Sequence, residues 1–98
     1  MELFCKFSVH EYMDMYPRTT ARTFVADDLE GIQNAAKGYA RYMNTNYSGG
    51  STTFIKVMSK EEARKYIEEQ CALVDPKLED PKEYSNRVWK IFHKCYGD

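Results

Sequence analysis

The feature that most constrains the fold is the alternation of apolar and polar side chains from Leu3 to Val9. A strand places successive side chains on opposite faces, so every second residue of this stretch shares a face. One face then carries Leu3, Cys5, Phe7 and Val9, and the other carries Phe4, Lys6, Ser8 and His10. The pattern predicts a half-buried strand, and the alternation fails at Glu11.

Two further stretches have the composition of strands. Residues 20–26, TARTFVA, are β-branched and aromatic, and only a short turn that includes Pro17 separates them from the first strand. This spacing predicts an antiparallel hairpin. Residues 52–58, TTFIKVM, predict a third strand.

Helix start and stop signals divide the rest of the chain. Asp27 or Asp28 is expected to cap a helix over residues 29–43, whose apolar residues recur at spacings of three and four. Ser59 and a glutamate three residues later form a capping box for a second helix, which Asp75-Pro76 stops. A third helix is expected over residues 81–96, with a cap and a proline at its start and Gly97 after it.

Gly31 and Gly38 lie on one face of the first predicted helix, where glycine costs about 0.5–1 kcal/mol relative to alanine. Two explanations stay open: the helix lies flat on the sheet, or this face meets a partner. Together the segments predict one compact α+β domain over residues 1–98, in the order β-β-α-β-α-α. We expect a small, mainly antiparallel three-stranded sheet with helices packed on one face. The helix at 81–96 could also dock on a partner or form a homodimer.

The composition narrows the function. The formal net charge of −1 and the even spread of both signs supply no concentrated basic surface for nucleic acid. Three cysteines without a C-x-x-C pattern suggest free thiols in a reducing cytoplasm. We find no signal peptide and no apolar run of the ~20 residues that span a membrane.

The loop TNYSGGSTTF, residues 45–54, has the composition of a phosphate-binding loop. Phosphate loops run from a strand into a helix, whereas this one runs from a helix into a strand, and no lysine follows Gly50. We therefore predict a turn with Gly49 or Gly50 at positive φ. A surface recognition loop with Tyr47 at its tip is the alternative.

No catalytic, metal or cofactor site is predicted. The two histidines, His10 and His93, lack the paired spacing of zinc ligands, and the cysteines fall on predicted core faces. Asp27 and Asp28 are better explained as a helix cap than as a general acid/base pair.

Aromatic and arginine side chains are the best candidates for a binding surface, because they dominate protein interfaces. The candidate partner-binding residues are Tyr12, Tyr16, Arg18 and Arg22 on the hairpin, Tyr47 on the loop, and Trp89 on the last helix. The same hairpin could instead stack nucleobases, or be exposed without a function.

Residues 22–43, RTFVADDLEGIQNAAKGYARYM, resemble a pattern in small α/β accessory proteins of bacteriophages and mobile elements. Some of those proteins inhibit bacterial defence systems, anti-CRISPR proteins among them. The resemblance implies a cytoplasmic, non-catalytic module that binds a host protein, such as a defence nuclease. A nucleic-acid or nucleotide binder is the alternative hypothesis, and a small enzyme is the third.

Overall fold

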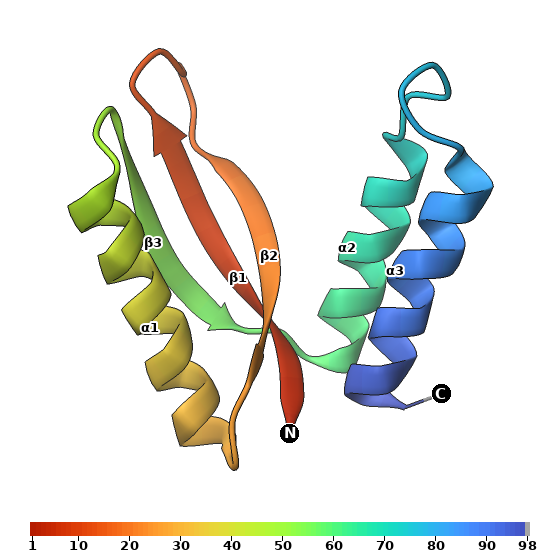
Figure 1. Ribbon diagram of the computed structural model, residues 1–98, viewed down its shortest axis with the longest axis horizontal. Helices are drawn as coiled ribbons and strands as arrows, with labels where there is room; N and C mark the ends of the chain where they lie inside the picture. The colour runs from red at the N-terminus through yellow and green to blue at the C-terminus, as the bar shows by residue number, and fades with distance from the viewer. Residues whose placement is uncertain (98) are drawn as a thin grey trace. The chain divides into compact units, whose positions relative to one another are not determined.

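Strands and helices follow one another in the predicted order. In the computed structural model, which describes residues 1–97, these elements are β1 (Glu2–Glu11), β2 (Arg18–Val25), α1 (Leu29–Asn46), β3 (Gly50–Val57), α2 (Lys60–Ala72) and α3 (Pro81–Tyr96) (Figure 1). The α+β class and the order β-β-α-β-α-α are therefore confirmed. The chain forms two compact units, residues 1–57 and residues 58 onward, and each is described by itself.

The first unit contains an antiparallel sheet with the strand order β2-β1-β3. β1 and β2 pair without interruption from Glu2 opposite Val25 to Val9 opposite Arg18, which confirms the predicted hairpin. β3 pairs with the other side of β1, and its register shifts once, between Lys6 and Phe7. Both β2 and β3 are thus edge strands.

The core of the first unit lies between α1 and one face of the sheet. The alternation predicted this face, and Cys5 and Phe7 are fully buried there against Ile32 of α1. The Phe7 ring is the centre of an aromatic cluster, 5.2 Å from the Tyr39 ring and 5.9 Å from both Phe24 and Phe54. Full burial of one such side chain contributes about 1.5–3 kcal/mol. The cluster therefore holds α1 on the sheet.

The two ends of α1 follow from local chemistry. The Asp28 carboxylate accepts a hydrogen bond from the Gly31 amide at 2.8 Å, so Asp28 is the N-cap. The helix continues to Asn46, three residues beyond the predicted end at 43. The chain then turns at Gly49, which has a φ of +90°. The prediction of a turn with a glycine at positive φ is confirmed.

The two glycines of α1 have different surroundings. A Cβ on Gly31 would lie 2.8 Å from the Cβ of Ala26, so this glycine lets the helix approach the end of β2. A Cβ on Gly38 would have no neighbouring atom within 4 Å. Packing within the unit explains Gly31 and leaves Gly38 unexplained.

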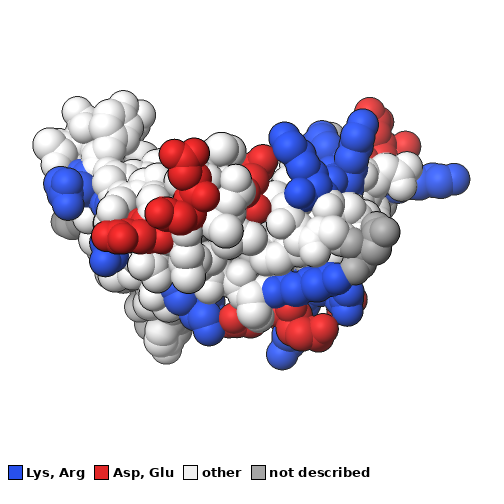
Figure 2. All heavy atoms as spheres, turned by 90° about the horizontal axis from the view of Figure 1, so that it is seen from below, with Lys and Arg blue, Asp and Glu red and all other residues white. Residues whose placement is uncertain are grey.

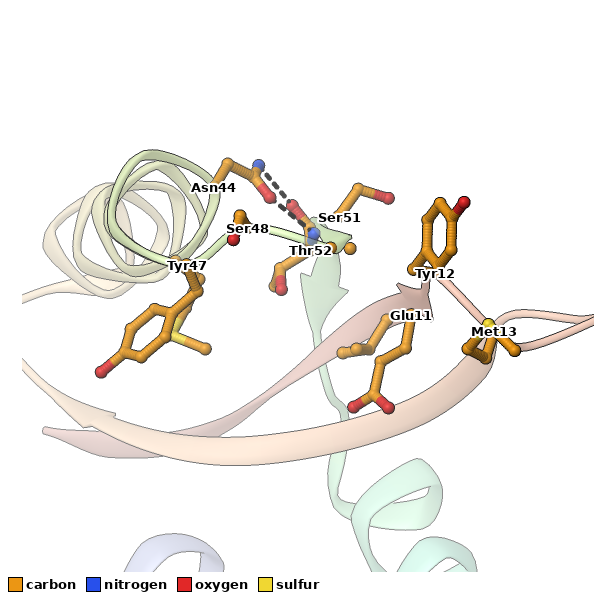
Figure 3. A pocket seen from close by; sticks show the side chains of 12 residues that line it. Glu11, Tyr12, Met13, Asn44, Tyr47, Ser48, Ser51 and Thr52 are labelled. Atoms are coloured by element: carbon orange, nitrogen blue, oxygen red, sulfur yellow. Dashed lines mark hydrogen bonds between the residues drawn. The ribbon is translucent and has the colours of Figure 1, made fainter.

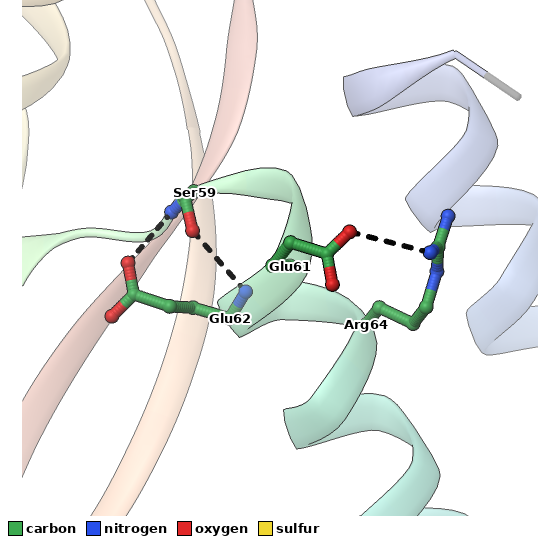
Figure 4. Close-up of polar contacts among 4 residues, drawn as sticks. All are labelled: Ser59, Glu61, Glu62 and Arg64. Carbon is green, nitrogen blue, oxygen red and sulfur yellow. Dashed lines mark hydrogen bonds and ion pairs between the residues drawn. The ribbon is translucent and has the colours of Figure 1, made fainter.

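The second unit is a pair of helices. Ser59 and Glu62 form the predicted capping box of α2, with bonds of 3.1 and 3.2 Å between each side chain and the other residue's amide (Figure 4). Asp80 caps α3, Pro81 is its first residue, and Gly97 ends it at a φ of +77°. Phe92 of α3 is fully buried, and the Arg64 guanidinium of α2 lies 5.7 Å from its ring centre.

No helix in the described part of the chain combines the length and the apolar character needed to cross a membrane.

Candidate functional site

Two loops meet at one end of the first unit. The β1–β2 hairpin loop covers residues 12–17, and the α1–β3 loop covers residues 47–49. The amide of Tyr12 donates a hydrogen bond to the carbonyl of Gly49. Gly50 lies opposite Glu11, and a Cβ there would be only 2.8 Å from the carbonyl oxygen of His10. A glycine at position 50 is therefore what lets the second loop approach the hairpin.

Asn44 fastens the end of α1 to the start of β3. Its side-chain amide donates to the Thr52 carbonyl at 2.9 Å, and its side-chain oxygen accepts from the Thr52 amide at 2.7 Å (Figure 3). The side chain thus occupies the position that a neighbouring strand would take beside Thr52, which is itself buried. This pair of bonds fixes where the α1–β3 loop emerges.

A surface hollow of about 410 Å³ lies between the two loops. Tyr47, which follows α1, and Tyr12, which follows β1, both line it, and Glu11 lies between them in Figure 3. Its lining consists of Val9, Glu11, Tyr12, Met13, Met43, Asn44, Tyr47, Ser48, Gly49, Gly50, Ser51 and Thr52. A lining that combines aromatic and methionine side chains with hydroxyl groups suits a hollow that receives an amphipathic side chain.

Large apolar side chains are exposed around this hollow. Within the hairpin loop, four of them are between 76% and 87% exposed, and Tyr47 on the second loop is 57% exposed. We call these residues the hairpin-tip surface: Tyr12, Met13, Met15, Tyr16 and Tyr47. Single exposed apolar residues are common, but a contiguous group of this kind marks an interaction site or an aggregation hazard.

Polar groups border the hairpin-tip surface and hold the hairpin in place. The Arg18 guanidinium donates to the Glu11 carboxylate at 2.7 Å, an exposed ion pair that contributes at most about 1 kcal/mol. The His10 ring nitrogen lies 3.0 Å from the Asp14 carbonyl oxygen. An apolar centre with a polar border is the usual anatomy of a protein interface.

The structure brings together only part of the predicted binding set. Tyr12 and Tyr47 border one hollow, and Tyr16 and Arg18 lie on the same hairpin. Arg22 lies further along β2, where its guanidinium stacks 4.9 Å from the Tyr39 ring centre. Trp89 belongs to the second unit, is partly buried, and packs edge-on against Phe92 at 5.3 Å.

Sequence reasoning missed the methionines and Asn44. Met15 belongs to the turn predicted at residues 14–18, and Met13 directly precedes it. The signal that could have found them is that connecting loops run over the surface, so their apolar side chains stay exposed. The role of Asn44 depends on a strand eight residues away, and its position near a helix end gave no specific signal.

One thiol and one carboxylate have clear structural roles. Burial raises the pKa of the Cys5 thiol from 9.0 to about 11, so it stays protonated at neutral pH, and a thiol is a poor nucleophile. The carboxylate of Asp28 is used as a helix cap. Within residues 1–97, no three His, Cys, Asp or Glu side chains gather in a way that would hold a metal ion.

Charged side chains of both signs are mixed on the surface. Figure 2 shows lysines and arginines beside aspartates and glutamates on one face, and neither sign covers that face alone. Comparison with protein-family models, with curated proteins and with solved structures finds no match for this chain.

Proposed function

We propose that this protein is a non-catalytic protein-binding module that docks a partner on the hairpin-tip surface. The observation that carries the proposal is the group of five exposed tyrosine and methionine side chains on the two loops, three of which, Tyr12, Met13 and Tyr47, line one hollow. Tyrosine and methionine are enriched at interface centres because they give large contact areas that adapt to a partner. A rigid sheet supports both loops, so little ordering is needed on binding.

Electrostatics favours a protein partner over nucleic acid. Arg18 is bonded to Glu11 and Arg22 is stacked on Tyr39, so neither arginine of the hairpin is poised for a phosphate. The mixed charges and the net charge of −1 also give little attraction to a polyanion.

One observation supports the non-catalytic part of the proposal, and another bears on the compartment. Among residues 1–97, Glu11 is the one carboxylate that lines the hollow, and it is paired with Arg18, whereas acid–base catalysis usually needs two positioned groups. The free thiols of Cys5, Cys71 and Cys95 favour a reducing compartment, so we place the protein in the cytoplasm. That the partner is a host factor such as a defence nuclease stays a prediction.

The test is a quantitative pull-down from host lysate with three tagged proteins. The first is the native chain, the second carries Tyr12→Ser, Met13→Ser and Tyr47→Ser, and the third is a matched control. The control carries Leu73→Ser and Leu78→Ser, which are 76% and 86% exposed in the second unit. Exposed substitutions change stability by about 0.5 kcal/mol or less each, so all three proteins should stay folded.

We expect one partner that is captured by the native chain and the control, and at least about tenfold less by the tip variant, as for loss of interface anchors. Equal capture by the tip variant would contradict the proposed surface. Each pull-down is repeated with nuclease and at high salt. If the captured material is lost after nuclease treatment or at high salt, the nucleic-acid alternative is favoured.

A further inference from the structure

The direction of the backbone groups of β2 follows from one hydrogen bond. The amide of Ala26 donates to the carbonyl of Met1 at 3.0 Å, which continues the β1–β2 ladder by one residue. The backbone N–H and C=O groups of successive residues alternate in direction along a strand. Those of the even-numbered residues of β2 therefore point toward β1. The backbone N–H and C=O groups of the odd-numbered residues point away from β1, out of the edge of the sheet. These residues are Thr19, Ala21, Thr23 and Val25.

The Asn44 bonds give an independent check. The amide and carbonyl of Thr52 point to Asn44 and hence away from β1, so Val9, which lies opposite Thr52, must turn its own groups toward β2. Val9 lies opposite Arg18 on that side. Arg18 is even-numbered, so both hydrogen-bond patterns give the same direction for β2.

The two edges of the sheet are unequal. Asn44 occupies the outer groups of Thr52 on β3, and β3 also carries the register shift. β2 has fewer of the usual protections of an edge strand: its sequence RTTARTFV contains no lysine or proline, its pairing has no bulge, and its only charged side chains are two arginines. Arg18 forms an ion pair with Glu11, and Arg22 stacks on the Tyr39 ring. Within the first unit, the described residues thus leave the outer backbone groups of β2 available to another strand.

We propose that this edge pairs with β2 of a second copy of the chain, antiparallel, about a two-fold axis through Ala21. The axis is perpendicular to the sheet, because only then do the outward residues of both copies meet while α1 covers the same face of both sheets. Thr19 of one copy then lies opposite Thr23 of the other, and Ala21 lies opposite itself.

Side-chain charge selects this register. Two registers pair the longest stretch of β2, one centred on Ala21 and the other on the next residue. The second places Arg22 opposite its own copy, and like charges directly opposite are unfavourable. Centring on Ala21 instead places Arg18 opposite Phe24 and Arg22 opposite Thr20. The chosen register therefore has no arginine opposite an arginine.

The dimer leaves the hairpin-tip surface free. That surface lies beyond the Arg18 end of β2, and the axis passes through the middle of the strand. The two copies of the surface therefore point to opposite ends of one continuous sheet. This inference is independent of the partner that the surface binds.

The first test is the mass in solution by sedimentation, from about 1 µM to about 1 mM, the range in which modest interfaces dissociate. We expect the mass to rise with concentration from 11.5 kDa to twice that value. Ala21→Lys and Ala21→Glu should each stay monomeric, because each places like charges opposite one another across the axis. An equimolar mixture of the two should recover the dimer, since opposite charges then face each other. Ala21→Thr is the neutral control and should dimerise as the native chain does.

Hydrogen exchange on the native chain tests the same inference without a variant. The amides of Thr19, Ala21 and Thr23 should exchange quickly in dilute solution and at least about tenfold more slowly at high concentration, because pairing protects them. The amides of Thr20 and Arg22 should be protected at both concentrations.

Three results would overturn the inference. The first is a constant monomer mass across the range. The second is a dimer that both charged variants form as readily as the native chain, which would place the interface elsewhere, for example on α3. The third is protection of the Thr19, Ala21 and Thr23 amides that does not depend on concentration.

Discussion

Replacing Asn44 by alanine should destabilise the first unit more than its position at a helix end suggests. The substitution removes two hydrogen bonds, of 2.9 and 2.7 Å, and leaves the amide and carbonyl of Thr52 without these partners. Thr52 is only 7% exposed, so water replaces the lost bonds poorly. An unsatisfied buried polar group costs about 1–3 kcal/mol, and partial hydration brings the expected total for the pair to about 2–3 kcal/mol.

The assay is urea unfolding followed by circular dichroism, where a loss of about 2 kcal/mol moves the midpoint by about 1 M for a small protein. Asn46→Ala is the matched control, because Asn46 makes a single exposed bond of 2.9 Å to the Tyr42 carbonyl. That variant should lose at most about 1 kcal/mol. Equal losses for the two variants would refute the conclusion that the Thr52 bonds hold the loop.

Further predictions follow from backbone contacts, burial and capping. Gly50→Ala should cost about 1–3 kcal/mol of overpacking, because the new Cβ lies 2.8 Å from the His10 carbonyl oxygen. Gly38→Ala should instead stabilise by about 0.5–1 kcal/mol, since no atom lies near its Cβ; thermal unfolding of both variants checks the contrast. Burial raises the pKa of Cys5 from 9.0 to about 11, so the unfolded chain loses this proton first, and the stabilisation present below pH 9 falls as the pH rises. The difference in unfolding free energy between the native chain and Cys5→Ala should then shrink by about 1.4 kcal/mol per pH unit from pH 9 to 11. Ser59→Ala breaks the capping box and should cost about 1 kcal/mol in the same unfolding assay.

The sequence predicted those parts of the fold that depend on neighbours along the chain. The alternation of Leu3 to Val9 predicted the buried face of β1, and the caps at Asp28 and Ser59 predicted two helix starts. These signals work because strand and helix periods differ and because a cap needs only a residue three positions away.

The candidate site depended on contacts that the sequence pattern does not encode. Tyr12 and Tyr47 are far apart in the chain. They line the same hollow because Gly50 allows the α1–β3 loop to lie close to the hairpin. The end of α1 was predicted three residues too early, at residue 43, because the apolar spacing of the helix ends there. In the structure, the Asn44 side chain forms hydrogen bonds with the Thr52 backbone of β3, and the helix continues past Asn44 to Asn46.

The unequal edges of the sheet determine how far association can proceed. A sheet with two open edges can add copies without limit, because each new copy offers another edge, and growth then leads to fibrils. Here Asn44 has already taken the groups that Thr52 would offer on β3. If β2 pairs as proposed, a third copy would have to use β3, where Asn44 occupies the outer groups of Thr52 and a register shift interrupts the strand, so we expect the assembly to close at two chains.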